Sequence, residues 1–194
     1  MRIAFGTEGW RAIVGDEFTV ANVCAVAQAI AEHVRSIGRP SAAHRRVAVG
    51  YDTRFLSDRF AAVICEVLAG NGLTAVLSER FIPTCAVSRY VVAHRLAAGI
   101  MVTASHNPPA YNGIKVKEAF GGSATSETVA SIERRVGHHP PRRLAFDEAR
   151  RRGRIRHADF LPEFVRGIRA FVNLAAIRRS RFRVLVDPMH GAAG

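Results

Sequence analysis

The sequence predicts an α/β fold, a three-layer α/β/α domain with a mixed, mainly parallel sheet, followed by the start of a second, similar domain. Short β-branched runs alternate along the chain with segments of helical periodicity, which is the pattern of βαβ units. Hydrophobic residues make up 48% of the 194 residues, enough to build a packed core. This length suits one α/β domain, or one domain plus part of another.

The first predicted helix follows Thr19, a residue type that caps helix N-termini. Gly38 and Pro40 end it, because neither residue type continues a helix well. The residues of its apolar side recur at the spacing of one helix face: Val20, Val23, Ala27, Ile30, Ala31 and Val34.

The middle of the chain alternates strands with helices. Short runs of apolar and β-branched residues predict strands at 47–51, 73–78, 99–105 and 113–117. Helical periodicity between and after them predicts helices at 57–68, 83–94 and 126–136.

A second pattern begins near Asp159. An apolar stripe from Phe160 to Val172 predicts a helix, and FRVLVD (182–187) predicts a strand that leads into a glycine-containing loop. We therefore expect three parts: a first α/β/α domain over 1–137, a basic connector over 138–158, and the truncated start of a second α/β/α domain over 159–194.

Positive charge is concentrated in one part of the chain. The formal net charge is +12, of which +10 falls within residues 131–183. A basic stretch can attract the phosphates of a nucleic acid. This stretch contains Pro140 and Pro141 and has no regularly spaced aromatic residues for base stacking, which favours a solvated connector or helix face. We expect no nucleic-acid partner.

Several other classes of protein are disfavoured. No apolar run approaches the roughly 18 residues of a membrane helix, and the first ten residues lack the apolar core of a signal peptide. Cys24, Cys65 and Cys85 are odd in number and show no CxxC spacing, which disfavours a disulfide framework or a zinc site. We expect a soluble cytoplasmic protein with no membrane partner.

Ligands of parallel sheets bind beyond the carboxyl ends of the strands. This rule selects three loops, at 52–54, 78–84 and 105–107. In the first loop, Asp52 and Thr53 suit a helix cap, and Arg54 either is solvated or faces an anion. We expect all three loops to meet at one edge of the sheet.

The segment 99–116, GIMVTASHNPPAYNGIKV, contains the main candidate site. Serine is a weak nucleophile without help, and the adjacent Ser105 and His106 point to opposite sides of an extended chain, which disfavours a Ser-His pair. An amide-rich turn near Lys115 suits a phosphorylated serine instead. Taken alone, the segment also fits a plain turn. Gly6 and Gly9 beside Arg11 similarly fit a turn or an anion site.

Several motifs occur together in one order: FGTEGWR, GYDTR, IPT, TASHNPPAYNGIKV and VDPMHG. In this order they resemble the α-D-phosphohexomutases, the phosphoglucomutase/phosphomannomutase family, over nearly the whole chain. The resemblance implies that Ser105 is the phosphoserine, which gives its phosphate to a hexose monophosphate and takes the other phosphate back from the resulting bisphosphate. Hexose 1,6-bisphosphate would be the activator.

The resemblance also implies roles for neighbouring residues. His106, Lys115 and Arg11 match catalytic positions, and Thr7, Arg54 and Asn107 match substrate-binding positions. Mg²⁺ would be held by the phosphate on Ser105 together with aspartates of a DGDxDR loop, which the 194 residues lack. We therefore expect an N-terminal fragment that is inactive without the remaining domains of the same enzyme.

Three questions stay open at this stage. Lys115 is either a general base or an electrostatic partner of the phosphate. The preferred hexose phosphate is not fixed by these residues. Two other functions remain as alternatives: a non-catalytic domain that binds sugar phosphates or anions, and a basic nucleic-acid-binding module.

Overall fold

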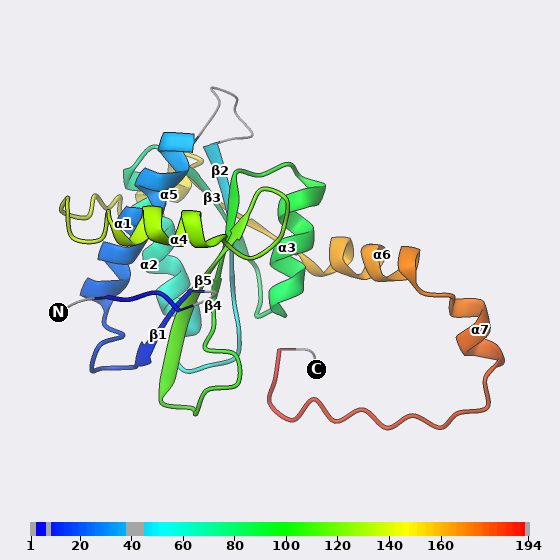
Figure 1. Ribbon diagram of the computed structural model, residues 1–194. Coiled ribbons are helices and arrows are strands. Elements are labelled where there is room, and N and C mark those ends of the chain that lie inside the picture. The colour runs from blue at the N-terminus through cyan, green and yellow to red at the C-terminus, as the bar shows by residue number, and fades with distance from the viewer. Residues whose placement is uncertain (1–2, 7–8, 38–44, 193–194) are drawn as a thin grey trace.

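The computed structural model describes residues 3–6, 9–37 and 45–192, which form one sheet covered by helices on both faces (Figure 1). The sheet confirms the predicted α/β class. Its six strands lie in the order β1 (Gly9–Ile13), β5 (Tyr111–Glu118), β4 (Ala98–Val102), β2 (Arg46–Tyr51), β3 (Thr74–Ser78) and β6 (Ile155–Ala158).

The sheet is mixed and mainly parallel, as the alternation of strands and helices predicts. β4, β2, β3 and β6 run parallel, whereas β5 pairs antiparallel with both β4 and β1. β4 lies inside the sheet, and all five of its residues are buried, which explains its unbroken apolar sequence AGIMV. The residues that follow β4 therefore extend from the centre of the sheet.

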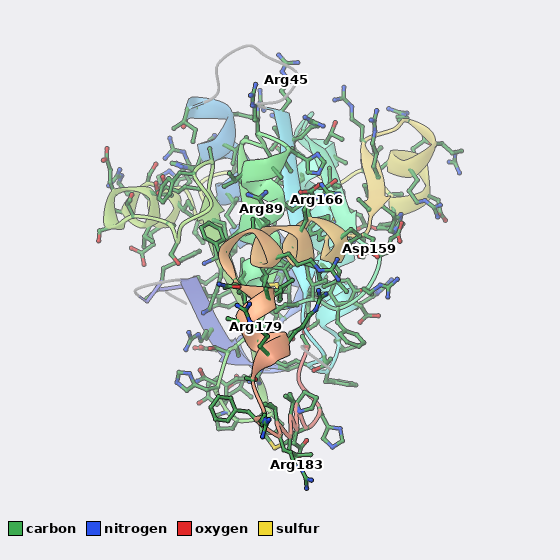
Figure 2. All side chains as sticks on the ribbon, turned by 90° about the vertical axis from the view of Figure 1, so that its right-hand side faces the viewer. Arg45, Arg89, Asp159, Arg166, Arg179 and Arg183 are labelled. Atoms are coloured by element: carbon green, nitrogen blue, oxygen red, sulfur yellow. The ribbon has the colours of Figure 1, made fainter. Side chains whose placement is uncertain are left out.

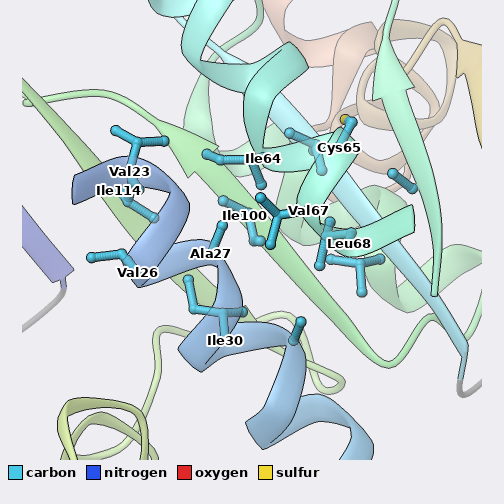
Figure 3. Close-up of a cluster of buried hydrophobic side chains, with 14 of the residues drawn as sticks. Val23, Val26, Ala27, Ile30, Ile64, Cys65, Val67, Leu68, Ile100 and Ile114 are labelled. Atoms are coloured by element: carbon cyan, nitrogen blue, oxygen red, sulfur yellow. The ribbon is translucent and has the colours of Figure 1, made fainter. Parts of the chain in front are cut away.

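Four helices cover one face of the sheet. They are α1 (Val20–Ile37), α2 (Ser57–Gly70), α4 (Ser126–Glu133) and α5 (Phe146–Arg151). Figure 3 shows the centre of this layer, where Ile30 of α1 and Ile64 of α2 lie close to Ile100 and Ile114 of the sheet. All four of these side chains are fully buried. Thr19 caps α1 as predicted, since its hydroxyl accepts a hydrogen bond from the Asn22 amide at 3.3 Å.

The opposite face is covered by α3 (Thr84–Ala93), and α6 (Leu161–Phe171) packs against α3 and extends away from the sheet in Figure 1. Tyr90 of α3 stacks on Phe160, with ring centroids 3.8 Å apart, which fixes the start of α6 against α3. α7 (Leu174–Arg179) follows, and the chain then returns toward the lower end of the sheet in the view of Figure 1. Among the described residues, none of the helices combines the length and apolar character required to cross a membrane.

Two strands, two short helices and one segment differ from the sequence expectations, and the helices α5 and α7 are the two that were not predicted. β1 and β6 were not predicted, and β6 lies within the expected connector 138–158, where it pairs with β3 and extends the sheet. The predicted strand at 182–187 is wrong. Val184, Leu185 and Val186 are 80%, 95% and 75% exposed, because no described strand lies beside them to complete a ladder. The proposed division into domains stays a prediction.

Candidate active site

Ser105 lies directly beyond the carboxyl end of β4, on the exposed loop that leads to β5. Its backbone is left-handed, with φ of 58°, a conformation that residues other than glycine rarely adopt. The Ser105 amide donates to the hydroxyl of buried Thr103 at 2.9 Å, and the Asn107 amide donates to the Ala104 carbonyl at 3.1 Å. These bonds hold a tight turn that presents the Ser105 hydroxyl to solvent.

A hollow of about 600 Å³ opens on one side of Ser105. Two cationic side chains, Arg11 and Lys115, and the imidazole of His106 line it together with the serine. Lys115 is only 8% exposed, and the Arg11 Nη1 donates to Asn107 Oδ1 at 2.9 Å. The structure therefore brings together four of the predicted catalytic residues, in a setting that favours an anion.

The pairing of β1 with β5 explains how two long cationic side chains fit beside the serine. Opposite residues of an antiparallel pair project to the same face, and here Arg11 is opposite Gly113 while Lys115 is opposite Gly9. A Cβ at Gly113 would lie 2.9 Å from the Arg11 Cγ, so the absence of a side chain there leaves room for arginine. β1, which was missing from the predicted strands, thus supplies half of the cationic pair.

A second hollow, of about 490 Å³, lies on the other side of Ser105. It is lined by residues of all three loops selected from the strand ends, among them Thr53, Thr84 and Asn107. The expected convergence of these loops is confirmed. The C-terminal segment also lines it through His190, whose carbonyl accepts a hydrogen bond from the Thr53 hydroxyl at 2.6 Å. Sequence reasoning did not identify this contact or the role of Thr103.

Thr7 and Arg54 are two of the predicted substrate-binding residues. Thr7 lies outside the described residues. Arg54 lies beside the loop of Ser105, but its guanidinium donates to backbone carbonyls of that loop and faces Asp52.

The described residues do not form a magnesium site. Within 3–6, 9–37 and 45–192, no group of three or more His, Cys, Asp or Glu side chains is placed to hold a metal ion. The carboxylate of Asp52 is used by Ser57 and Arg54. A phosphate on Ser105 would contribute oxygen ligands of the kind that Mg²⁺ prefers.

Arginines are spread along the side of the molecule shown in Figure 2, from Arg45 through Arg89 and Arg166 to Arg179 and Arg183. Several arginines of the basic stretch form ion pairs with acidic side chains: Arg143 with Glu66, Arg151 and Arg152 with Glu148, and Arg166 with Glu163. Of these acidic partners only Glu66 lies outside the stretch, so the pairs leave most of its positive charge uncompensated. The expected lack of a nucleic-acid partner stays a prediction.

Residues 2–142 match the family model described as phosphoglucomutase/phosphomannomutase, alpha/beta/alpha domain I. The chain belongs to this family. This phosphoglucomutase/phosphomannomutase family member is 27% identical over 99% of its length to a phosphoglucomutase of Komagataeibacter xylinus, and 34% identical over 97% to a phosphoglucosamine mutase of Frankia alni. It spans 37% and 41% of those two relatives.

Solved structures agree with this assignment. The family member superposes on a Thermus thermophilus protein, to which a phosphomannomutase function is attributed, with a TM-score of 0.79 and 36% identity. That match covers 91% of this chain and 38% of the other. A phosphoglucomutase of Paramecium in its open form shares the fold, with a TM-score of 0.80 at 18% identity, over 97% of this chain and 39% of the other.

Proposed function

We propose that this chain is the phosphoserine-bearing part of a phosphohexomutase that interconverts hexose 1-phosphate and hexose 6-phosphate. The observation that carries the proposal is the placement of Ser105 beyond β4, in a hollow that also contains Arg11, His106 and Lys115. Phosphoryl transfer depends mainly on positioning and on neutralising charge, and this arrangement supports both.

The proposed cycle uses Ser105 twice. A sugar hydroxyl attacks the phosphorus of phosphoserine, the new sugar O–P bond forms, the Ser105 O–P bond breaks, the hydroxyl proton passes to a base, and the released Ser105 oxygen takes up a proton. The resulting hexose 1,6-bisphosphate reorients, and the Ser105 hydroxyl then gives its proton to a base and attacks the other phosphate. That transfer returns the phosphoryl group to serine, returns a proton to the leaving sugar oxygen and releases the isomer.

The side chains that line the hollow beside Ser105 have two roles, charge stabilisation and proton transfer. The Arg11 guanidinium stays charged throughout and stabilises the phosphoryl oxygens. Lys115 and His106 are the groups of the hollow whose chemistry allows them to act as acid or base or to contribute a charge. If Lys115 is the base, Lys115→Arg abolishes turnover. If Lys115 acts through its charge, Lys115→Arg keeps a measurable fraction of activity.

The proposal is tested with protein expressed from its complete gene, because this chain spans less than half of its relatives. We expect turnover of hexose 1-phosphate that requires Ser105, is stimulated by hexose 1,6-bisphosphate and depends on Mg²⁺. Residues 1–194 alone should show no full cycle. A complete protein that binds hexose phosphates but never phosphorylates Ser105 would instead be a non-catalytic binding protein.

A further inference from the structure

The side chain of Arg54 connects two loops at the carboxyl edge of the sheet. It belongs to the loop after β2, and its side chain is 15% exposed. Its Nη1 and Nη2 donate to four backbone carbonyls of the loop that carries Ser105, at 2.6–2.9 Å: Ser105, Asn107, Pro108 and Tyr111. Its Nε lies 3.5 Å from Asp52 Oδ2.

These contacts occupy both terminal nitrogens of the guanidinium. An arginine has five N–H groups, two on each terminal nitrogen and one on Nε. The terminal nitrogens of Arg54 each meet two carbonyls, and Nε faces Asp52. A phosphate could bind this fork only by displacing carbonyls of the loop. Arg54 also lines a hollow beside Ser105, the second one. It differs from Arg11 because its two terminal nitrogens are already bonded to backbone carbonyls.

The loop of Ser105 needs such a support because its backbone does not follow a regular ladder. Ser105 is left-handed, and Pro108 and Pro109 have no N–H to donate. Four carbonyl oxygens that converge on one point repel one another, and a positive charge between them reverses that repulsion. Arg54 thus bridges the four carbonyls as a non-covalent cross-link that holds the loop in one conformation.

The other end of the cross-link is also fixed. Asp52 Oδ1 accepts hydrogen bonds from the Ser57 hydroxyl at 2.9 Å and from the Arg54 amide at 3.0 Å. Asn112, at the start of β5, donates to the Ser57 hydroxyl at 2.9 Å. Ser57 and Asn112 are fully buried. Arg54 therefore projects from a packed base, and its position does not depend on solvent.

We propose that Arg54 is a positioning residue that fixes the backbone of the Ser105 loop through four carbonyls, and that it is not a ligand of the substrate phosphate. Its effect on phosphoryl transfer rests on the proposed function, whereas its effect on the order of the loop does not. Arg54→Lys separates the two roles. Lysine keeps the charge that would attract phosphate but lacks the planar fork that reaches four acceptors.

The first test is amide hydrogen exchange on residues 1–194 without phosphate. In Arg54→Gln and Arg54→Lys we expect the amides of Ser105, Asn107 and Tyr111 to exchange roughly tenfold faster or more. The loop opens more often because the Arg54 hydrogen bonds to its carbonyls are lost, and each such bond contributes on that scale. Amides of β2 and β4 should keep their protection, which shows that the fold is intact. The control is Arg59→Gln, which removes an exposed arginine of α2.

Unchanged exchange of the loop in Arg54→Gln overturns the proposal, as does full protection in Arg54→Lys, which would show that charge alone is sufficient. If Arg54→Gln does not fold, Asp52→Asn provides a milder change. It removes the carboxylate charge that faces Nε and accepts from Ser57 and the Arg54 amide, and the same three amides report it. Loop exchange that stays at the wild-type rate in a folded Asp52→Asn protein would then count against the proposal.

The second test is kinetic and uses protein from the complete gene. A positioning role lowers kcat in Arg54→Lys by about tenfold or more while KM for the hexose phosphate changes little. A rise in KM with unchanged kcat would assign Arg54 to substrate binding and overturn the proposal. The exchange result stands on its own, so a protein without mutase activity would refute the proposed function and leave the loop support testable.

Discussion

The substitution Gly9→Ala tests how closely β1 must approach β5 for the site to form. A Cβ at this position would lie 2.1 Å from the carbonyl oxygen of Ile114 and 3.0 Å from Cα of Lys115. Ordinary contact begins at 3.4 Å, so Gly9→Ala forces the two strands apart by about 1.3 Å at this point. Both contacts are with backbone atoms, which cannot rotate away, and Gly9 has a φ of 149° that disfavours a side chain.

Gly72→Ala is the matched control for this substitution. Gly72 has a φ of 77°, but a Cβ there meets nothing within 4 Å, so only the conformational cost of about 1–2 kcal/mol applies. Gly9→Ala adds displacement of backbone, and we expect a total loss of about 2–5 kcal/mol in the free energy of unfolding. Urea unfolding of both variants measures the difference.

Trp10 fluorescence and phosphate binding by Arg11 and Lys115 show which parts of the site the Gly9→Ala substitution displaces. Trp10, the only tryptophan, is 3% exposed and stacks on Phe18 at a centroid distance of 4.8 Å. In Gly9→Ala its emission should shift to longer wavelength, and inorganic phosphate should bind roughly tenfold more weakly as Arg11 moves away from Lys115. The reasoning is refuted if Gly9→Ala matches Gly72→Ala in stability, emission and phosphate affinity.

Three further predictions concern the core, the cationic pair and acid stability. Ile64→Ala should lower the free energy of unfolding by about 2–5 kcal/mol in urea, because its side chain is fully buried between α2 and the sheet. Lys115→Met should weaken binding of inorganic phosphate about tenfold in calorimetry, whereas Lys117→Met, two residues along the same strand and bonded to the Ser123 hydroxyl, should change it little. Burial, assisted by the charge of Arg135, lowers the pKa of His33 below its ordinary 6.5. The unfolded chain therefore binds a proton that the folded chain does not as the pH falls below 6.5, so stability decreases there and is fully present above it; His33→Gln should reduce this dependence in urea unfolding at pH 7 and 5.5.

The sequence predicted the elements whose periodicity is local. Thr19 and the apolar stripe defined α1, and the unbroken apolar run defined β4. β1 was not predicted, because its five residues include a glycine and an arginine and show little of the pattern of a strand. Its partner β5 is also about a hundred residues away in the sequence. The run at 182–187 shows the reverse case: its strand pattern has no described neighbour to pair with.

The sequence predicted which types of residue surround Ser105, but not which atoms each of them contacts. The rule of strand carboxyl ends correctly grouped the three loops, and the residues around Ser105 were expected to bind an anion. Arg54 shows the limit of this reasoning. An arginine fork fits carbonyl oxygens as well as phosphate oxygens, and only the folded loop reveals which acceptors it meets.

The central claim is that Ser105 carries the phosphoryl group. Its most direct test is peptide mapping of protein expressed from the complete gene, after exposure to hexose 1,6-bisphosphate and then to hexose monophosphate. We predict phosphate on the peptide that contains Ser105 after the first step, its loss to the sugar after the second, and none in Ser105→Ala. Mutase turnover with Ser105 unmodified at every stage, or with phosphate on another residue, would contradict the account.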